Sequence, residues 1–486
     1  MIRNLYLDST DNSKLDFYLD GKRITQMYLD GVCVWDVSGD NRLIIEGYCS
    51  GYYQFQYTLA WLTYLDYTIN VPIIDNVNSC TWNDFTVPNS LTGTIDWGDG
   101  TTEPYNSDNN YTHDYYNNFE YFQKNYNQQY GSVYFKITIT FDTDIVAIIN
   151  PSFFNAGYNR IIAIHFPDSC KYLPNNMSFD NLFNDVPITL NVPQNMNILT
   201  CYPSGNDVIQ EFNIPNTVQY LGLDEYFCNA QGYYNSGVFQ SCGNLNTIDI
   251  PKSVKLIGSR CFHNCSNLQT ITGLDGVEVF GYDCFNTCDN LEPFPLPDTT
   301  KYILAQSFDM VGNKYYGYDA HDFYIDQSRT SYLDFNCNAP IDVYKVPEGC
   351  IFIGYHGFSS CYWFRILSLP KTIKYLAKEF YISGCAVMEV IYCGSVSEWF
   401  NIKFTETDAQ NYDNTEDFFN NKQITDKEFY KSMNMSMYRI ICDDGIIINP
   451  YATGNFIDGT EYSGYGDNCF NDNGSAIKEN FLILNQ

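Results

Sequence analysis

The chain has 486 residues, enough for about three domains with sizeable cores. Hydrophobic residues make up 45% of it and charged residues only 17%, which excludes an intrinsically disordered chain. The 57 acidic and 26 basic residues give a net charge of −31, which repels phosphate backbones, so we expect no nucleic-acid partner. No apolar run approaches the roughly 20 residues that span a bilayer, and the start contains no signal-like apolar stretch. We therefore expect no export signal and no membrane insertion.

The N-terminal segment contains two consecutive copies of Y-L-D-G, which begin at Tyr18 and Tyr28. An Asp-Gly pair between alternating flanks predicts a β-hairpin at each copy. Hairpins this small need a partner surface to be stable, so we interpret residues 1–40 as an attachment element, with Tyr18, Tyr28 and Trp35 as candidate contacts. The pattern I-x-x-x-Y-x-D-G-x-x-V-W, which ends at Trp35, resembles a short N-terminal motif of tailed-bacteriophage structural proteins. Alternatively, the hairpins are outer strands of the next domain.

Residues 41–148 contain two alternating segments, Leu91–Trp97 and Val133–Phe141, which predict a pair of β-strands. W-G-D-G-T, followed by Y-T-H-D-Y-Y, resembles the signature of the PKD-type β-sandwich, which implies a spacer or adhesive module. Calcium ligation by Asp96, Asp99 or Asp114 is a weaker alternative, because one strand and one turn offer too few convergent oxygens for six to eight ligands. We therefore predict no metal site.

Further along, the chain repeats F-x-x-C-x-x-L-x-x-I-x-I-P at a step of 23 residues. A short fixed period predicts a solenoid whose turns share one core, and the alternating I-x-I predicts parallel strands about 4.8 Å apart. The cysteines follow this repeat and lack the spacing of zinc ligands, so we expect buried free thiols, with disulfides as the alternative. The predicted repeat core is Phe239, Cys242, Leu245, Phe262, Cys265, Leu268, Phe285, Cys288, Leu291, Phe358 and Cys361.

The segment I-P-K-S-V-K-L-I-G-S-R-C-F-H-N-C-S-N-L, Ile250 to Leu268, resembles the BspA-type leucine-rich repeats of bacterial and phage surface proteins. This resemblance implies a leucine-rich-repeat solenoid over residues 149–448. The segment from Val390 to Phe404 resembles the closing unit of such arrays, and residues 449–486 form a C-terminal extension. The predicted fold is therefore mainly β: N-terminal hairpins, a PKD-like β-sandwich and a BspA-type solenoid.

Two insertions, at residues 224–239 and 311–338, interrupt the regular step. Extra residues in a repeat array usually form loops on one face, often the binding face. Tyrosine supplies rigid contact area at low entropic cost, so these loops hold the candidate partner contacts. Alternatively, their aromatic side chains fold back onto the solenoid. The candidate contacts are Tyr315, Tyr316, Tyr318, Asp319, Tyr324, Tyr233 and Tyr234.

No catalytic constellation is visible around the five histidines, and no Gly-rich phosphate loop is present, so we predict no enzymatic activity and no cofactor. The leading interpretation is a structural virion protein of a tailed bacteriophage, tail- or fibre-associated, present in multiple copies on the virion exterior. Its N-terminus would dock on other virion proteins, and its solenoid would bind a host-surface glycan or protein. The alternative is a BspA-type adhesin on the bacterial cell surface, and less favoured is a glycan hydrolase.

Overall fold

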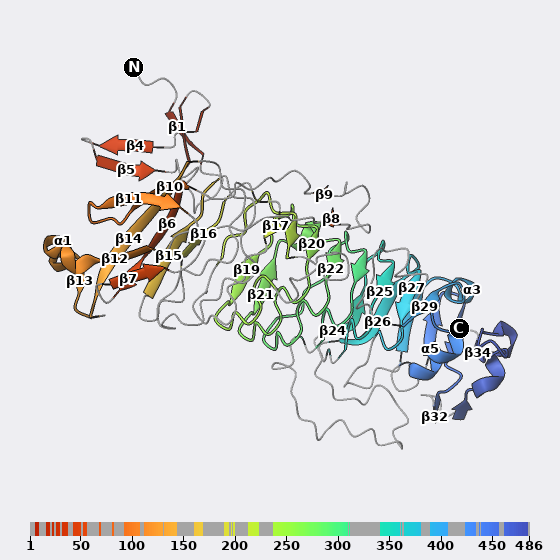
Figure 1. Ribbon diagram of the computed structural model, residues 1–486. Helices are drawn as coiled ribbons and strands as arrows, with labels where there is room; N and C mark the ends of the chain where they lie inside the picture. The colour runs from red at the N-terminus through yellow and green to blue at the C-terminus, as the bar shows by residue number, and fades with distance from the viewer. Residues whose placement is uncertain are drawn as a thin grey trace.

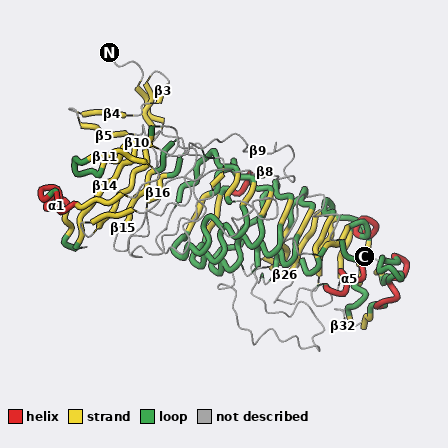
Figure 2. The backbone as a smooth tube through the Cα atoms, viewed as in Figure 1, coloured by secondary structure: helices red, strands yellow, loops and turns green. Residues whose placement is uncertain are grey.

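The fold is mainly β, as predicted, and strands outnumber helices in Figures 1 and 2. Only 12% of the residues that the structure describes are helical. Among the described residues, no helix is both long and apolar enough to span a membrane. The structure is a computed structural model that describes residues 5–8, 16–19, 22–23, 26–29, 32–36, 42–49, 52–55, 68–69, 80–81, 92–106, 111–129, 131–142, 160–168, 189–193, 196, 198–199, 212–222, 237–309, 311, 341–359, 361, 364–380, 389–406, 423–433, 437, 439–455 and 461–484.

Two small antiparallel units lie at the N-terminus. Leu19 pairs with Lys22 and Leu29 pairs with Val32, which confirms a hairpin at each Y-L-D-G copy. An additional strand pairs with the first hairpin and makes it a three-stranded sheet. The strands are β1 (Leu5–Asp8), β2 (Asp16–Leu19) and β3 (Lys22–Arg23), then β4 (Gln26–Leu29) and β5 (Val32–Asp36).

The front half is built on a sheet with the strand order β11-β10-β14-β6-β15-β16, to which β13 (Tyr126–Asn127) adds at β14. The predicted pairing of these two segments is confirmed: β10 and β14 pair, in antiparallel orientation, with Ile95 opposite Ile139. Alternate residues of β6 and β14 are buried, so one face of the sheet covers a core. The strands are β6 (Arg42–Cys49), β10 (Thr92–Asp96), β11 (Thr102–Asn106) and β14 (Ser132–Phe141).

Smaller elements complete the front half. Strands β7 (Tyr52–Phe55) and β12 (Tyr111–Asp114) pair, as do β8 (Thr68–Ile69) and β9 (Cys80–Thr81). The 3-10 helix η1 (Tyr115–Asn117) leads into helix α1 (Phe119–Asn125).

The front sheet continues beyond residue 148, the boundary expected from the sequence. Strand β15 (Arg160–His165) pairs antiparallel with β6, and β16 (Thr189–Asn191) pairs parallel with β15. In Figure 1 the labelled strands of the solenoid begin beyond β16 on the side away from β11. Buried side chains of this sheet and of the solenoid belong to one hydrophobic core, so the front sheet covers the N-terminal end of the array.

The solenoid has two ladders of strands. The predicted parallel pairing of the I-x-I segments is confirmed by β19 with β21, and by β24, β26, β28 and β30. The sequence did not indicate the other ladder, an eight-stranded parallel sheet of mostly two-residue strands.

The I-x-I ladder consists of two separate sheets. The first comprises β19 (Thr247–Asp249) and β21 (Thr270–Thr272), and the parallel strands of the second are β24 (Ile341–Lys345), β26 (Phe364–Pro370), β28 (Glu389–Cys393) and β30 (Arg439–Cys442). The eight-stranded sheet comprises β17 (Ile198–Leu199), β18 (Tyr220–Leu221), β20 (Leu256–Ile257), β22 (Val279–Phe280), β23 (Tyr302–Ile303), β25 (Phe352–Ile353), β27 (Tyr375–Ala377) and β29 (Lys403–Thr405). The 3-10 helix η3 (Leu274–Gly276) lies between β21 and β22.

Besides the strands of the two ladders, the turns have a third side without strands. On this side, residues other than glycine adopt the left-handed backbone conformation. Arg260 and Asp283 have φ of 55° and 60° and occupy equivalent positions 23 residues apart. This backbone lets N–H groups of one turn donate to carbonyls of the next, as from Phe239 to Cys261 (2.7 Å) and from Phe262 to Cys284 (2.8 Å). Every side of the turn is therefore hydrogen-bonded to its neighbour.

All eleven residues of the repeat core are fully buried. The Phe262 ring lies 5.2 Å from those of Phe239 and Phe285, nearly parallel to both. The Cys265 thiol donates to the Phe239 carbonyl (2.9 Å), and the Cys288 thiol repeats this bond to Phe262 (3.0 Å). The cysteines thus satisfy carbonyls of the preceding turn as well as filling space.

Two residues that the sequence analysis assigned to the insertions belong to the core of the solenoid. Phe239 stacks in the core although we assigned it to the insertion at 224–239, and Val311, assigned to that at 311–338, is 1% exposed. Both residues occupy repeat positions, so burial keeps them in the array. The rings of Phe308 and Phe358 stack at 5.4 Å, so consecutive turns meet across the second insertion.

The C-terminal extension closes the other end of the solenoid. Strand β31 (Gly445–Ile448) turns back antiparallel on β30, and β34 (Ile483–Leu484) pairs with β31. Tyr430, on helix α5, accepts a hydrogen bond from the Trp399 indole (2.8 Å), and the rings of Phe470 and Phe481 pack against it. The remaining elements are α3 (Val396–Trp399), α5 (Asp426–Ser432), β32 (Thr453–Asn455), β33 (Glu461–Ser463), η5 (Gly466–Cys469) and η6 (Lys478–Asn480).

Candidate binding surfaces

The predicted contact residues fall in different parts of the chain. Tyr28 and Trp35 lie in one hairpin, β4–β5, whereas Tyr18 lies in the separate sheet of β1, β2 and β3. The predicted attachment residues are therefore divided between two small sheets. The tyrosine-rich candidates lie outside the described residues: Tyr233, Tyr234, Tyr315, Tyr316, Tyr318, Asp319 and Tyr324.

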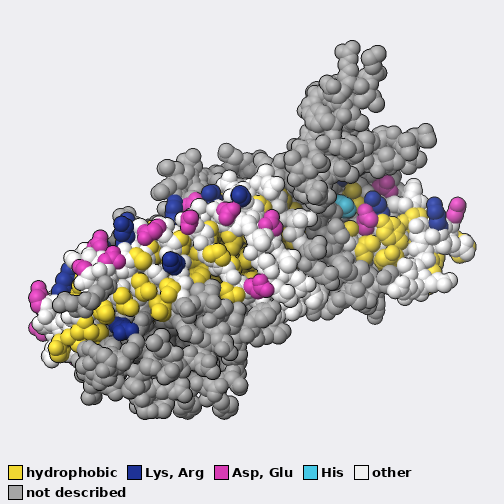
Figure 3. Space-filling model, turned by 180° about the vertical axis from the view of Figure 1, so that it is seen from behind, with side chains coloured by type: hydrophobic (Ala, Val, Ile, Leu, Met, Phe, Trp, Pro, Cys, Tyr) yellow, Lys and Arg dark blue, Asp and Glu magenta, His cyan; other side chains and the backbone are white. Residues whose placement is uncertain are grey.

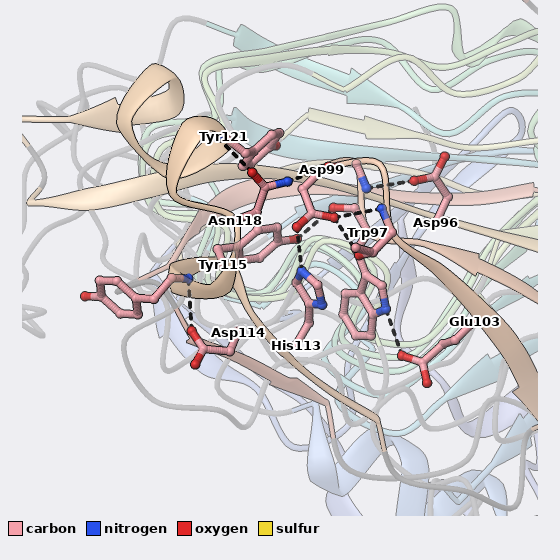
Figure 4. A network of polar contacts seen from close by, with 12 residues as sticks. Asp96, Trp97, Asp99, Glu103, His113, Asp114, Tyr115, Asn118 and Tyr121 are labelled. Carbon is pink, nitrogen blue, oxygen red and sulfur yellow. Dashed lines mark hydrogen bonds and ion pairs between the residues drawn. The ribbon is translucent and has the colours of Figure 1, made fainter.

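The W-G-D-G-T turn is the centre of a polar network in the front half (Figure 4). The Asp99 carboxylate, almost fully buried, contacts the His113 ring nitrogen at 3.0 Å and accepts a hydrogen bond from the Thr101 hydroxyl at 2.6 Å. Trp97 stacks on His113 with ring centroids 4.7 Å apart. The Tyr115 hydroxyl donates to the Trp97 carbonyl (2.9 Å). The residues of the signature thus hold strands β10, β11 and β12 together.

The three carboxylates considered as calcium ligands each shape a backbone turn. Asp96 accepts from the Gly98 N–H (2.8 Å), Asp99 from the Thr101 N–H (3.0 Å), and Asp114 from the Tyr116 N–H (2.9 Å). Within the part of the chain that the structure describes, no group of three or more His, Cys, Asp or Glu side chains is arranged to hold a metal ion.

The electrostatics of Asp99 fit this structural role. Burial alone would raise the pKa of Asp99, but hydrogen bonds from Thr101 and His113 outweigh it and lower the pKa below its ordinary value. The carboxylate therefore stays ionised and bonded, so it stabilises the turn and is poorly suited to act as a general acid.

The outer surface of the solenoid carries ion pairs that follow the repeat. Glu278 contacts Lys255 of the preceding turn (3.3 Å) and Lys301 of the next (2.9 Å). Lys252 pairs in the same way with Asp275 (3.2 Å). Figure 3 shows such acidic and basic side chains alternating in a row. Glu278 is buried between its two lysines, whereas Lys252 and Asp275 are exposed, and an exposed pair of this kind adds little stability.

Hydrophobic side chains also reach the outer surface of the solenoid, and Figure 3 shows them gathered beside the charged row. They include half-buried residues of the I-x-I ladder and of β31 in two short rows: Val343 lies opposite Ile366, and Ile391, Ile441 and Ile446 lie opposite one another in turn, two residues further along the strands. We call this set the outer apolar stripe: Val343, Ile366, Ile391, Ile441 and Ile446. Sequence analysis missed this stripe. Some of these strands are also apolar at the x position of the I-x-I pattern, and apolar residues at successive positions indicate apolar side chains on both faces of a sheet.

Comparison with known proteins identifies part of the solenoid. Residues 232–314 match the family described as "BspA type Leucine rich repeat region", in six copies. No curated protein matches the chain by sequence.

Three solved structures of low similarity are leucine-rich-repeat or vaccine-antigen proteins. A leucine rich cell surface protein from Faecalibacterium prausnitzii A2-165 is 20% identical with a TM-score of 0.29; the match covers 53% of this chain and 54% of that one. A leucine-rich repeat protein from Bacteroides ovatus ATCC 8483 is 16% identical (TM-score 0.31; 55% and 67% covered). The pneumococcal vaccine antigen PcpA is 14% identical (TM-score 0.30; 58% and 68% covered). The chain thus spans about half the length of the first of these structures, and its residues 232–314 are similar to the BspA-type leucine-rich-repeat region.

Proposed function

We propose that the chain is a structural attachment protein on the exterior of a tailed-bacteriophage virion. The observation that carries the proposal is the solenoid itself. Phenylalanine rings from successive turns fill its interior, so a ligand can reach only its outer surface. A long array of this kind offers extended binding surface and no interior cavity for a substrate.

Both ends of the solenoid are covered by other parts of the chain, so its lateral surfaces are the ones left for binding. The front sheet shares its hydrophobic core with the solenoid at one end, and Phe470 and Phe481 pack at the other. In this proposal residues 1–40 dock on other virion proteins, which fits the Y-x-D-G-x-x-V-W pattern in β4 and β5. The outer apolar stripe and the tyrosine-rich insertions then contact a host glycan or protein. We propose binding without catalysis.

A second candidate is an adhesin on a bacterial cell surface. The match of residues 232–314 to the BspA-type family favours it, because such repeats resemble those of bacterial surface proteins. Under this alternative the solenoid works in the same way, and only the anchoring of the N-terminus differs.

Immunogold electron microscopy separates the two candidates. An antibody raised against the purified chain is applied to cells of the source culture and to particles released from them. Labelling of virion tails or fibres is the expected result, whereas labelling of the cell envelope alone supports the adhesin. Label confined to the cell interior, with none on either surface, would refute both.

A further inference from the structure

Exposed aromatic side chains are concentrated around helix α1. Five large hydrophobic side chains are exposed among the described residues, and three of them lie here: Tyr116 (57% exposed), Phe119 (66%) and Tyr126 (43%). The Phe122 ring lies 4.6 Å from that of Tyr116 and 5.4 Å from that of Tyr126, so it joins the two. We call these four residues the aromatic platform. Figure 1 shows α1 at the end of the molecule opposite the C-terminus.

The platform is held rigidly from beneath. Tyr121 points the other way from the platform: its hydroxyl donates to the Tyr134 carbonyl of β14 (3.2 Å), and its ring stacks on buried Tyr115. The Asn118 side chain caps α1 by accepting from the Tyr121 N–H (3.1 Å) and donates to the Asp99 carbonyl (2.8 Å). The backbone that carries the rings is fixed in this way, so it loses little conformational entropy when a ligand binds.

The surroundings of the platform are polar and hold no excess of positive charge, since the half-buried Asp114 carboxylate accepts a hydrogen bond from the Tyr116 N–H (2.9 Å). Asn117, Gln123, Gln128 and Gln129 are exposed and supply amide donors and acceptors. Glu120 and Lys124, both exposed, give the helix one negative and one positive charge. The site therefore selects a neutral ligand that combines apolar faces with many hydroxyl or amide groups.

We propose that the aromatic platform is a binding site for neutral glycans, whose sugar rings lie against the aromatic rings while the amides bond their hydroxyls. A second copy of the chain fits poorly, because copies of charge −31 repel and stable interfaces use about 20 to 30 residues a side. An anionic membrane fits poorly, since the helix offers Lys124 and no basic cluster. For its biological role the inference rests on the proposed attachment function.

The test uses the full-length chain on an array of neutral glycans built from glucose, galactose, mannose and N-acetylglucosamine, with sialylated and sulfated glycans as anionic comparators. The variant is the double substitution Tyr116→Ala and Phe119→Ala. The matched control is Tyr465→Ala, because Tyr465 is also an exposed tyrosine (54%) but lies at the other end of the chain. We expect the unchanged chain to bind at least one neutral glycan, the double variant to bind it at least about tenfold more weakly, and the control to bind it unchanged.

Far-UV circular dichroism and thermal unfolding should be the same for all three proteins, since the two substituted rings are exposed. Failure to bind any neutral glycan, preference for the anionic glycans, or equal binding by the double variant would overturn the inference. So would light scattering that shows a dimer abolished by the double substitution, because a second copy would then occupy the platform. Immunogold labelling is independent of these outcomes, so a failed glycan site leaves the proposed attachment function standing.

Discussion

Truncation of Phe285 to alanine tests whether the phenylalanine stack holds the solenoid together. The side chain is fully buried, and its ring lies nearly parallel to those of Phe262 (5.2 Å) and Phe308 (5.6 Å). Loss of its burial costs about 1.5 to 3 kcal/mol, and loss of each stacked contact about 0.5 to 1.5 kcal/mol. Together these agree with the roughly 3 to 5 kcal/mol typical of Phe→Ala in a core.

The free energy of unfolding is measured by urea titration, with circular dichroism as the signal that reports unfolding. Phe294→Ala is the matched control, because Phe294 belongs to the same repeat and touches Phe285 edge-on (5.9 Å) but is only partly buried. It should cost less than half as much as Phe285→Ala. A loss below about 1 kcal/mol for Phe285→Ala would show that neighbouring turns close the gap, and that the stack is not the main source of cohesion.

Three further results are expected. Burial raises the pKa of the Cys288 thiol well above its ordinary value, so mass spectrometry after thiol labelling at pH 8 should find it unmodified until the chain unfolds, whereas Cys393, partly exposed, should react before it; early labelling of Cys288 would contradict its burial. Because the pKa of Asp99 is lowered in the fold, its stabilising effect is present above the ordinary value of about 3.9 and is lost as the pH falls through the folded value. Asp99→Asn should therefore lower the unfolding temperature at pH 7 but lose less on acidification than the unchanged chain, and parallel pH profiles would refute this. Deletion of residues 1–40 should leave the unfolding transition intact and abolish incorporation into particles, and normal incorporation would place the anchor elsewhere.

The fold was predictable from the sequence where apolar residues recur at a fixed step. Cys265 and Cys288 stand at equivalent positions, and their spacing alone specifies neighbouring turns of one core. The eight-stranded ladder was not predictable in this way, because strands such as Leu256–Ile257 are too short to show alternation. Left-handed Arg260 and Asp283 also gave no signal, since residues other than glycine and asparagine are rarely expected there.

The candidate binding surfaces were less predictable than the fold. The predicted contacts were chosen for tyrosine content, and Tyr315 to Tyr324 stay a prediction outside the described residues. The aromatic platform has a similar composition, but the direction of its rings depends on Tyr121 reaching β14 and on Asn118 reaching Asp99. Composition indicates which side chains can bind, whereas only the packing of a helix on its sheet determines which of them face solvent.

Because the core is continuous, deletion of residues 1–40 and deletion of residues 1–148 should have different effects on folding. Buried hydrophobic residues from Leu43 in the front half to Phe481 near the C-terminus belong to one contiguous core. Deletion through residue 40 stops before β6 and leaves this core untouched. Deletion through residue 148, the boundary that the sequence suggested, removes β6. It therefore leaves the edge of β15 that pairs with β6 open, and it exposes Ile164, now 1% exposed. An open strand edge and newly exposed apolar surface favour aggregation, so the longer deletion should form soluble aggregates while the shorter one stays monodisperse in size-exclusion chromatography. A monodisperse, cooperatively folded product of the longer deletion would show that the front sheet is only a neighbour of the solenoid and not its N-terminal cap.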